Sequence, residues 1–174
     1  MRDEPQAQSH DARHQKRYKR AMSVLSPTEL KSAVPKGKTY LGLDIGSKTI
    51  GVAVSDVGHM IASPRETIAR TKFSRDATRL REISATDTVG GIVVGLPVEM
   101  DGSEGTRCQS VRDLTTEIVK ALDLPAAFWD ERLSTAAVER VLIGDADASR
   151  KRRGEVVDKM AAAWILQGFL DSAG

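Results

Sequence analysis

The sequence predicts an α/β domain in which a mixed five-stranded sheet is flanked by helices. Three strand-like runs come first, between residues 40 and 69, and short connections join them. Two further strand-like runs, at residues 90–96 and 126–129, then alternate with helical segments. An antiparallel meander followed by β–α alternation is typical of a mixed sheet whose first strand lies between the two halves.

Charge divides the 174-residue chain, whose net charge is +2, into two parts. Residues 1–39 hold nine Lys/Arg and four Asp/Glu, whereas residues 40–174 hold seventeen and twenty. We predict a basic, poorly ordered N-terminal tail at 1–39 and one folded domain at 40–174. Within the tail, Ser26–Glu29 resembles a helix start with proline at the first helical position. A nucleic acid would therefore have to meet a local basic patch of a mildly acidic domain.

Composition excludes several classes of protein. No apolar run approaches the ~20 residues that a membrane-spanning helix needs, so we expect no membrane contact. The N-terminus lacks the pattern of a secretory signal. The single cysteine, Cys108, cannot form an internal disulfide, which is typical of a reducing compartment. We expect a cytoplasmic protein.

The stretch Tyr40–Asp56 reads as a β-hairpin. Apolar side chains alternate along residues 41–45 and 50–54, and Gly46-Ser47-Lys48 fits a tight connection between them. The opposite face carries small residues and a single carboxylate, Asp44. Such a face either lets another backbone pack closely or leaves room for a ligand.

The next segments predict an edge strand, a helix and a central strand. Residues 60–69 read as a strand that Pro64 restricts to the edge of the sheet. Residues 73–85 have helical spacing, with Ser74 as the expected cap. The uninterrupted apolar run at 90–96 is typical of a central parallel strand.

The second half of the chain alternates loops, helices and one short strand. In order we expect a loop at 97–105, a helix at 106–122, a strand at 126–129, a helix at 135–143, a polar loop at 145–154 and a helix at 155–170. Ligands of such sheets bind beyond the carboxyl ends of the central strands. Asp44 and Glu131 both lie near ends of this kind.

Three carboxylates occur in unusually apolar surroundings. Asp44 lies within a strand, Glu131 follows two aromatic residues, and Asp158 projects from the apolar face of the last helix. Burying a carboxylate is costly unless it is hydrogen-bonded, paired with a cation or bound to a metal. Each acid alone could equally cap a helix or pair with an arginine. Whether Asp130 replaces Glu131, or Asp56 joins the set, stays open at this point.

The three acids together would suit divalent cations. Three carboxylates converging within ~5 Å repel pairwise by ~3 kcal/mol at an effective dielectric constant of about 20. Mg²⁺ or Mn²⁺ would offset that repulsion, because the candidate ligands are all oxygen atoms. Two such ions about 4 Å apart are the usual device for displacement at phosphorus.

Four motifs resemble, in order and spacing, those of the YqgF (RuvX) family. They are Gly42–Asp56, Val94–Gly105, Asp130–Ser134 and Asp158–Gln167. These family members are nucleases related to Holliday-junction resolvases and implicated in maturing the 5′ end of 16S ribosomal RNA. The resemblance runs from Tyr40 to Asp171 and implies a ribonuclease H-like fold. It also implies that Asp44, Glu131 and Asp158 are the catalytic, metal-binding acids.

The expected function is Mg²⁺-dependent endonuclease cleavage of structured nucleic acid, foremost at the 5′ end of pre-16S rRNA. The residues expected to grip phosphates are Lys48, Arg132, Arg150, Lys151, Arg152 and Arg153. Aromatic residues make up only 4% of the chain, which disfavours recognition by base stacking. Recognition through backbone and shape suits structured RNA or branched DNA.

Three alternatives stay open. The chain could resolve Holliday junctions in branched DNA, or bind nucleic acid in ribosome assembly without cleaving it. The opening hairpin also resembles the first phosphate loop of actin-like and sugar-kinase ATPases, but these need a duplicated fold that this length does not allow. The sequence leaves undecided whether the substrate is RNA or DNA, and whether the protein is a monomer or a homodimer.

Overall fold

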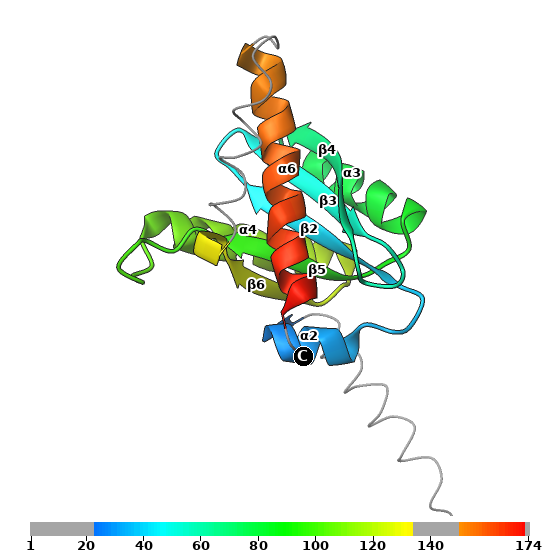
Figure 1. Cartoon of the computed structure of the whole chain (residues 1–174). Helices are drawn as coiled ribbons and strands as arrows, with labels where there is room; N and C mark the ends of the chain where they lie inside the picture. The colour runs from blue at the N-terminus through cyan, green and yellow to red at the C-terminus, as the bar shows by residue number, and fades with distance from the viewer. Residues whose placement is uncertain (1–22, 134–149, 173–174) are drawn as a thin grey trace, which may run out of the picture.

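The computed structural model describes residues 23–133 and 150–172, which form one mixed sheet with helices on both faces (Figure 1). The strands are β1 (Val24–Leu25), β2 (Thr39–Ile45), β3 (Thr49–Ser55), β4 (Ala62–Ala69), β5 (Val89–Leu96) and β6 (Ala126–Asp130). The helices are α2 (Pro27–Ala33), α3 (Phe73–Thr86), α4 (Thr106–Leu122), the 3₁₀ turn η1 (Glu131–Leu133) and α6 (Arg150–Asp171). No helix within these ranges is long and apolar enough to cross a membrane.

The sheet has the strand order β1-β6-β5-β2-β3-β4. β2 pairs antiparallel with β3 and parallel with β5, so the meander and the alternating half meet at β2, as the sequence predicts. β5 is buried along its whole length, and β4 lies at the edge with Pro64. The predicted α/β, ribonuclease H-like fold is confirmed, and the five predicted strands are all present.

The sixth strand comes from the segment predicted to be a tail. β1 pairs parallel with β6, and Ser26 and Glu29 form a reciprocal capping box at the start of α2. Leu30 of α2 is fully buried in one of the two core clusters. The predicted boundary at residue 39 is therefore wrong for residues 23–38, because a two-residue strand and a seven-residue helix show little periodicity. Residues 1–22 lie outside the described part of the chain.

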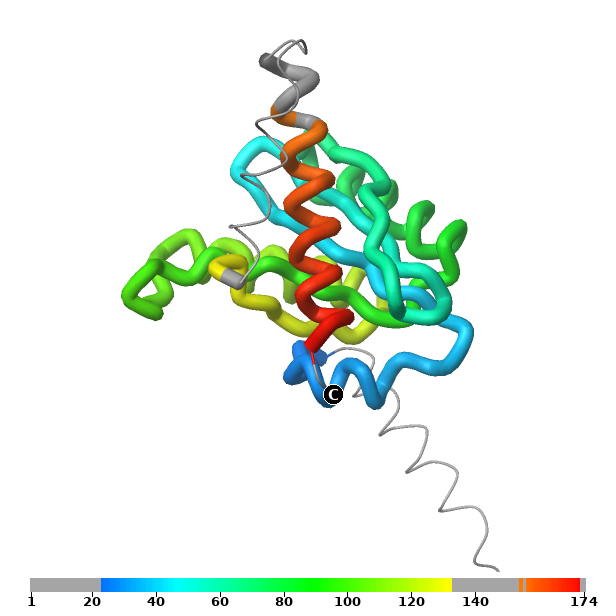
Figure 2. The backbone as a smooth tube through the Cα atoms, in the orientation of Figure 1, coloured from blue at the N-terminus to red at the C-terminus, as the bar shows by residue number. Residues whose placement is uncertain are grey.

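Helices cover the two faces of the sheet with separate hydrophobic clusters. α3 and α4 pack on one face and α6 runs along the other, with α2 beside the C-terminal end of α6 (Figure 2). Side chains along β2 point alternately to the two faces of the sheet. Leu41 and Leu43 face the α3/α4 cluster. The intervening residue, Gly42, faces α6. The face of β2 that holds Asp44 is therefore the one under α6.

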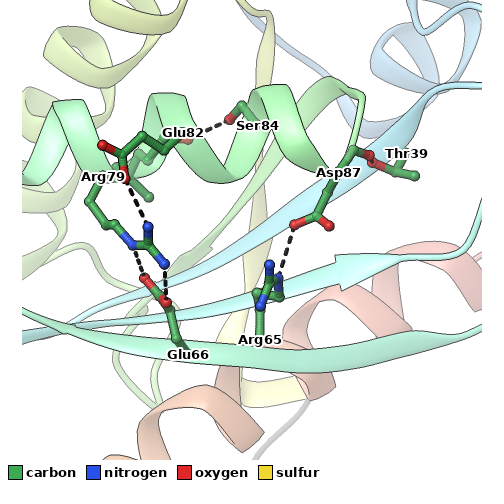
Figure 3. Close-up of polar contacts among 8 residues, drawn as sticks. Thr39, Arg65, Glu66, Arg79, Glu82, Ser84 and Asp87 are labelled. Carbon is green, nitrogen blue, oxygen red and sulfur yellow. Dashed lines mark hydrogen bonds and ion pairs between the residues drawn. The ribbon is translucent and has the colours of Figure 1, made fainter.

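Ion pairs link the edge strand β4 to α3 (Figure 3). The guanidinium of Arg79 donates to both carboxylate oxygens of Glu66, at 2.7 and 2.8 Å, and also to Glu82. Arg65 donates to Asp87 at 3.0 Å. Exposed pairs of this kind contribute about 0–1 kcal/mol each. Charged side chains on an edge strand also discourage pairing with another chain.

Two helix starts differ from the prediction. α3 begins at Phe73 without a side-chain cap, so the predicted role of Ser74 is wrong. α6 begins at Arg150 and takes in the end of the predicted polar loop, because arginine and lysine are good helix formers. The predicted helix at 135–143 lies outside the described residues.

Asp56 organises the loop between β3 and β4. Its carboxylate accepts hydrogen bonds from the backbone amides of Gly58, Met60 and Ile61, at 3.0, 2.7 and 2.8 Å. The amide of Ile61 makes the largest contribution to a lowered pKa of Asp56. The side chain is thus used by its own loop, which leaves Asp56 out of the acidic set.

We predict that Asp56→Ala lowers the melting temperature at pH 7, because three loop amides lose their acceptor. A carboxyl group whose folded-state pKa is lowered stabilises the fold above its unfolded pKa, and this stability disappears as the pH falls through the folded value. The difference in melting temperature between wild type and variant should therefore shrink towards pH 3. Thermal unfolding at both pH values tests this, and an equal difference at both would contradict it.

Candidate active site

Glycines on the sheet bring α6 unusually close to Asp44. A methyl group on Gly42, two residues before Asp44, would lie 2.7 Å from Cβ of Leu166 and 2.9 Å from the carbonyl oxygen of Ala162. Gly51 is the cross-strand partner of Asp44, and a methyl group there would overlap the carbonyl oxygen of Asp158. The small residues of this hairpin thus allow the backbone of α6 to pack closely beside Asp44.

Glu131 follows β6 and lies over the neighbouring strand β5. β6 ends at Asp130, which pairs with Leu96, and Glu131 opens the 3₁₀ turn that follows. A methyl group on Gly95 would lie 2.8 Å from Oε1 of Glu131. The missing side chain at Gly95 therefore gives Glu131 room over β5, in the direction of β2.

Electrostatic interactions couple Asp44 to each of the other two acids. Burial raises the pKa of Asp44 to about 6, with the charge of Asp158 as the second cause. Burial also raises the pKa of Glu131 to about 7, with the charge of Asp44 as the second cause. Asp44 is thus the central member, coupled to an acid on each side. The positive charge of Arg107 acts in the opposite direction and lowers the pKa of both Asp44 and Glu131. The sequence analysis did not single out Arg107.

Thr49 is a second residue that the sequence analysis missed. Its hydroxyl donates a hydrogen bond to Oδ2 of Asp158 at 2.7 Å. Thr49 opens β3 and Asp158 lies on α6, so this bond fixes the carboxylate relative to the sheet. Only the three-dimensional contact reveals it, because 109 residues separate the two.

Asp130 has a different partner from the three acids. Its carboxylate accepts from Nη2 of Arg132 at 2.6 Å and from the Arg132 backbone amide at 3.0 Å. The hydrogen bond from the Arg132 side chain is the main cause of a lowered pKa of Asp130. Glu131, and not Asp130, therefore faces Asp44, and the predicted phosphate ligand Arg132 is held in an ion pair.

The other predicted phosphate ligands lie in two places, the turn after β2 and the first turn of α6. Lys48 is exposed in the turn between β2 and β3, close in sequence to Asp44 and Thr49. Arg150–Arg153 form the first turn of α6, the helix that carries Asp158, but their side chains lie outside the described part of the structure.

The acidic residues fit a hard divalent cation by their chemistry. Carboxylate and hydroxyl oxygens are ligands that Mg²⁺ and Mn²⁺ accept, and a cation would relieve the repulsion within the set. Within residues 23–133 and 150–172, no three Asp, Glu, His or Cys side chains already form a metal-binding group.

We predict that Thr49→Val weakens Mg²⁺ binding by about 10-fold, the lower end of the effect of removing an outer-shell partner. Without the hydroxyl, the Asp158 carboxylate loses its fixed orientation. The Mg²⁺ concentration that gives half-maximal stabilisation against heat measures this change. Thr116→Val is the matched control, because its hydroxyl bonds only to a carbonyl of its own helix. Equal Mg²⁺ dependence in both variants would exclude the orienting role.

Comparison with known proteins identifies the family. A family model described as "RuvX: Holliday junction resolvase" matches residues 38–172. A protein of Paramagnetospirillum magneticum, named a candidate pre-16S rRNA nuclease, is 58% identical over 151 residues. The alignment covers 87% of this chain and 97% of that protein. The chain belongs to the RuvX family.

Another RuvX relative, from Caulobacter vibrioides and of the same name, is 56% identical over 151 residues, which are 86% of this chain and 97% of that protein. The four motifs and all three acids lie inside the RuvX match, whereas β1 and α2 precede it. The family predicted from the motifs is therefore confirmed.

Solved structures resemble the RuvX chain more distantly. Thermus thermophilus RuvC in complex with a Holliday junction substrate has a TM-score of 0.46 and 15% identity, covering 74% of this chain and 91% of RuvC. The yeast mitochondrial Holliday junction resolvase Ydc2 has a TM-score of 0.43 and 12% identity, covering 88% of this chain and 82% of Ydc2. Both TM-scores are below 0.5, so neither likeness bears on the chemistry of the RuvX site.

Proposed function

We propose that this RuvX protein is a Mg²⁺-dependent endonuclease that hydrolyses phosphodiester bonds at the 5′ end of pre-16S rRNA. The observation that carries the proposal is the electrostatically coupled set of Asp44, Glu131 and Asp158, from β2, η1 and α6. Three half-buried acids, two of them with pKa values raised by burial and by a neighbouring acid, form an unfavourable arrangement for folding alone. A site that binds cations and phosphate explains it.

Asp44 is the residue best placed to serve two metal ions, because it couples to Glu131 on one side and Asp158 on the other. Bound divalent ions would supply charge neutralisation and activation of water. The chain itself supplies the rest. Thr49 orients Asp158, and Gly95 leaves Glu131 room to reach the site.

The names of similar proteins favour a structured RNA substrate. The relatives with more than half of their residues identical carry the name of a pre-16S rRNA nuclease. The exposed Lys48, in the turn between β2 and β3, suits contact with the phosphates of either nucleic acid. Such a substrate would place the work of the protein in the bacterial cytoplasm.

A direct comparison of substrates tests the proposal. The purified full chain is incubated with an end-labelled 16S precursor and with a four-way DNA junction, each in Mg²⁺ and in EDTA. We expect cleavage at the 5′ end of the precursor, faster than that of the junction and absent in EDTA. Faster cleavage of the junction would favour the resolvase function that the family description names. Binding of both without cleavage would favour an assembly factor.

A further inference from the structure

The first turn of α4 lies directly beyond the carboxyl end of β5. Cys108 is fully buried, and its thiol donates to the carbonyl oxygen of Pro97 at 3.0 Å, just after β5 ends. This contact leaves no accessible thiol for a disulfide-linked dimer. Arg107 precedes Cys108 and is exposed. The buried cysteine thus anchors the turn, and its neighbour projects from the same edge of the sheet.

The loop before α4 keeps this arrangement in place. The amide of Glu99 donates to Ser103 at 3.0 Å and that of Gly102 donates to Glu99 at 2.8 Å, which closes the loop on itself. The loop lies beside η1, where Arg132 donates to the carbonyl oxygen of Glu99 at 3.5 Å (Figure 2). The start of α4 is therefore held near the turn that carries Glu131.

Arg107 differs from the other arginines near this edge. Arg112 pairs with Glu104 and lies over the ring of Phe128, and Arg132 pairs with Asp130. Arg107 makes no ion pair or hydrogen bond with any residue that the structure describes. Arg107 lies in the first turn of α4, beyond the carboxyl end of β5, and Glu131 lies over that same end of β5, so the guanidinium is available at the edge of the sheet that holds the acids.

We propose that Arg107 binds the phosphate that is cleaved, through its non-bridging oxygens. This proposal rests on the proposed nuclease function and assigns the site a further catalytic residue. A guanidinium presents its donors in a planar fork that matches phosphate oxygens. Cations aimed at a reacting phosphoryl group stabilise the charge that develops there. Arg107 donates hydrogen bonds and transfers no proton. The oxygen of water bonds to phosphorus and releases one proton to solvent, the bridging P–O bond breaks, and the leaving oxygen takes up one proton from solvent.

Cleavage by Arg107→Ala and Arg107→Lys, in the full chain, tests the catalytic part. At saturating protein, we expect the single-turnover rate for the 16S precursor to fall about 10²–10³-fold in the alanine variant. Lysine keeps the charge but loses the fork, so its rate should lie between the two. Arg75→Ala is the matched control, because Arg75 is also exposed in the first turn of a helix and has no charged partner among the described residues. It should cleave at the wild-type rate.

Binding provides a readout that a purely structural role would not change. The labelled precursor is titrated in Ca²⁺ in place of Mg²⁺, at several salt concentrations. Loss of one phosphate contact should lower the magnitude of the slope of log K against log[salt] by about 0.7–1 in Arg107→Ala, whereas Arg107→Lys keeps the charge and should keep the slope. The slope should stay unchanged in Arg75→Ala. If Arg107→Ala fails to fold, Arg107→Gln removes the charge in its place.

The outcomes distinguish the proposed nuclease function from the proposed phosphate contact of Arg107. Wild-type rates and salt slopes in the Arg107 variants, beside an inactive Asp44→Asn, would overturn the role of Arg107 and leave the nuclease function standing. A wild-type chain that cleaves neither RNA nor junction DNA would overturn both. A reduced rate together with a reduced slope in Arg107→Ala, with the slope kept in Arg107→Lys and both quantities kept in Arg75→Ala, would establish the phosphate contact.

Discussion

Asp44→Asn should abolish Mg²⁺-dependent cleavage, with a loss of at least about 10³-fold in the single-turnover rate, because the acid coupled to both neighbours is removed. An amide of the same shape keeps the packing but loses the charge that binds cations. Cleavage of the labelled 16S precursor at saturating Mg²⁺ measures the effect. Asp56→Ala is the control, since Asp56 serves only its own loop and should leave the rate per folded molecule unchanged.

The same variant should be more stable than the wild type when metal is absent. Asp44 carries a desolvated charge beside Asp158, and its replacement by an amide removes a cost of about 2 kcal/mol once partial exposure is taken into account. In EDTA the melting temperature should therefore rise. Mg²⁺ should then stabilise the wild type and leave the variant unchanged. A variant that cleaves as fast as the wild type would show that the site is misplaced.

The sequence suffices for the central features of this fold, because they depend on local periodicity. Alternation in Tyr40–Asp56 predicts the β2–β3 hairpin, and the apolar run at 90–96 predicts the buried β5. An acid in apolar surroundings is visible in the same way, which is why Asp44 stands out. Its coupling to Glu131 and Asp158 required the fold.

The features that sequence reasoning missed all depend on contacts between distant residues. Thr49 is an ordinary strand threonine until α6 brings Asp158 to it. Arg107 is one of many exposed arginines until the bond from Cys108 to Pro97 fixes its turn near the acids. β1 is too short to carry a pattern and is recognised only by its pairing with β6. A single sequence contains no local signal for any of these contacts.

Gly51→Ala should destabilise the protein and inactivate it, because Gly51 is the point where the sheet and α6 approach most closely around the site. A methyl group there would overlap the carbonyl oxygen of Asp158, a backbone atom that cannot rotate away. α6 must therefore shift, at a cost of about 3 kcal/mol, the upper part of the usual range for overpacking. Urea denaturation measures the loss of stability.

The matched control is Gly154→Ala, a glycine substitution on α6 itself. Gly154→Ala adds a methyl group that meets nothing within 4 Å, so it should leave activity intact and stabilise α6 by about 0.5–1 kcal/mol. A folded Gly51→Ala protein with wild-type stability would contradict the close approach of α6. The decisive comparison is activity under conditions where Gly51→Ala is still folded. Since the shift displaces Asp158 from Asp44, cleavage should be lost before the fold is, which would show that this contact sets the geometry of the acids.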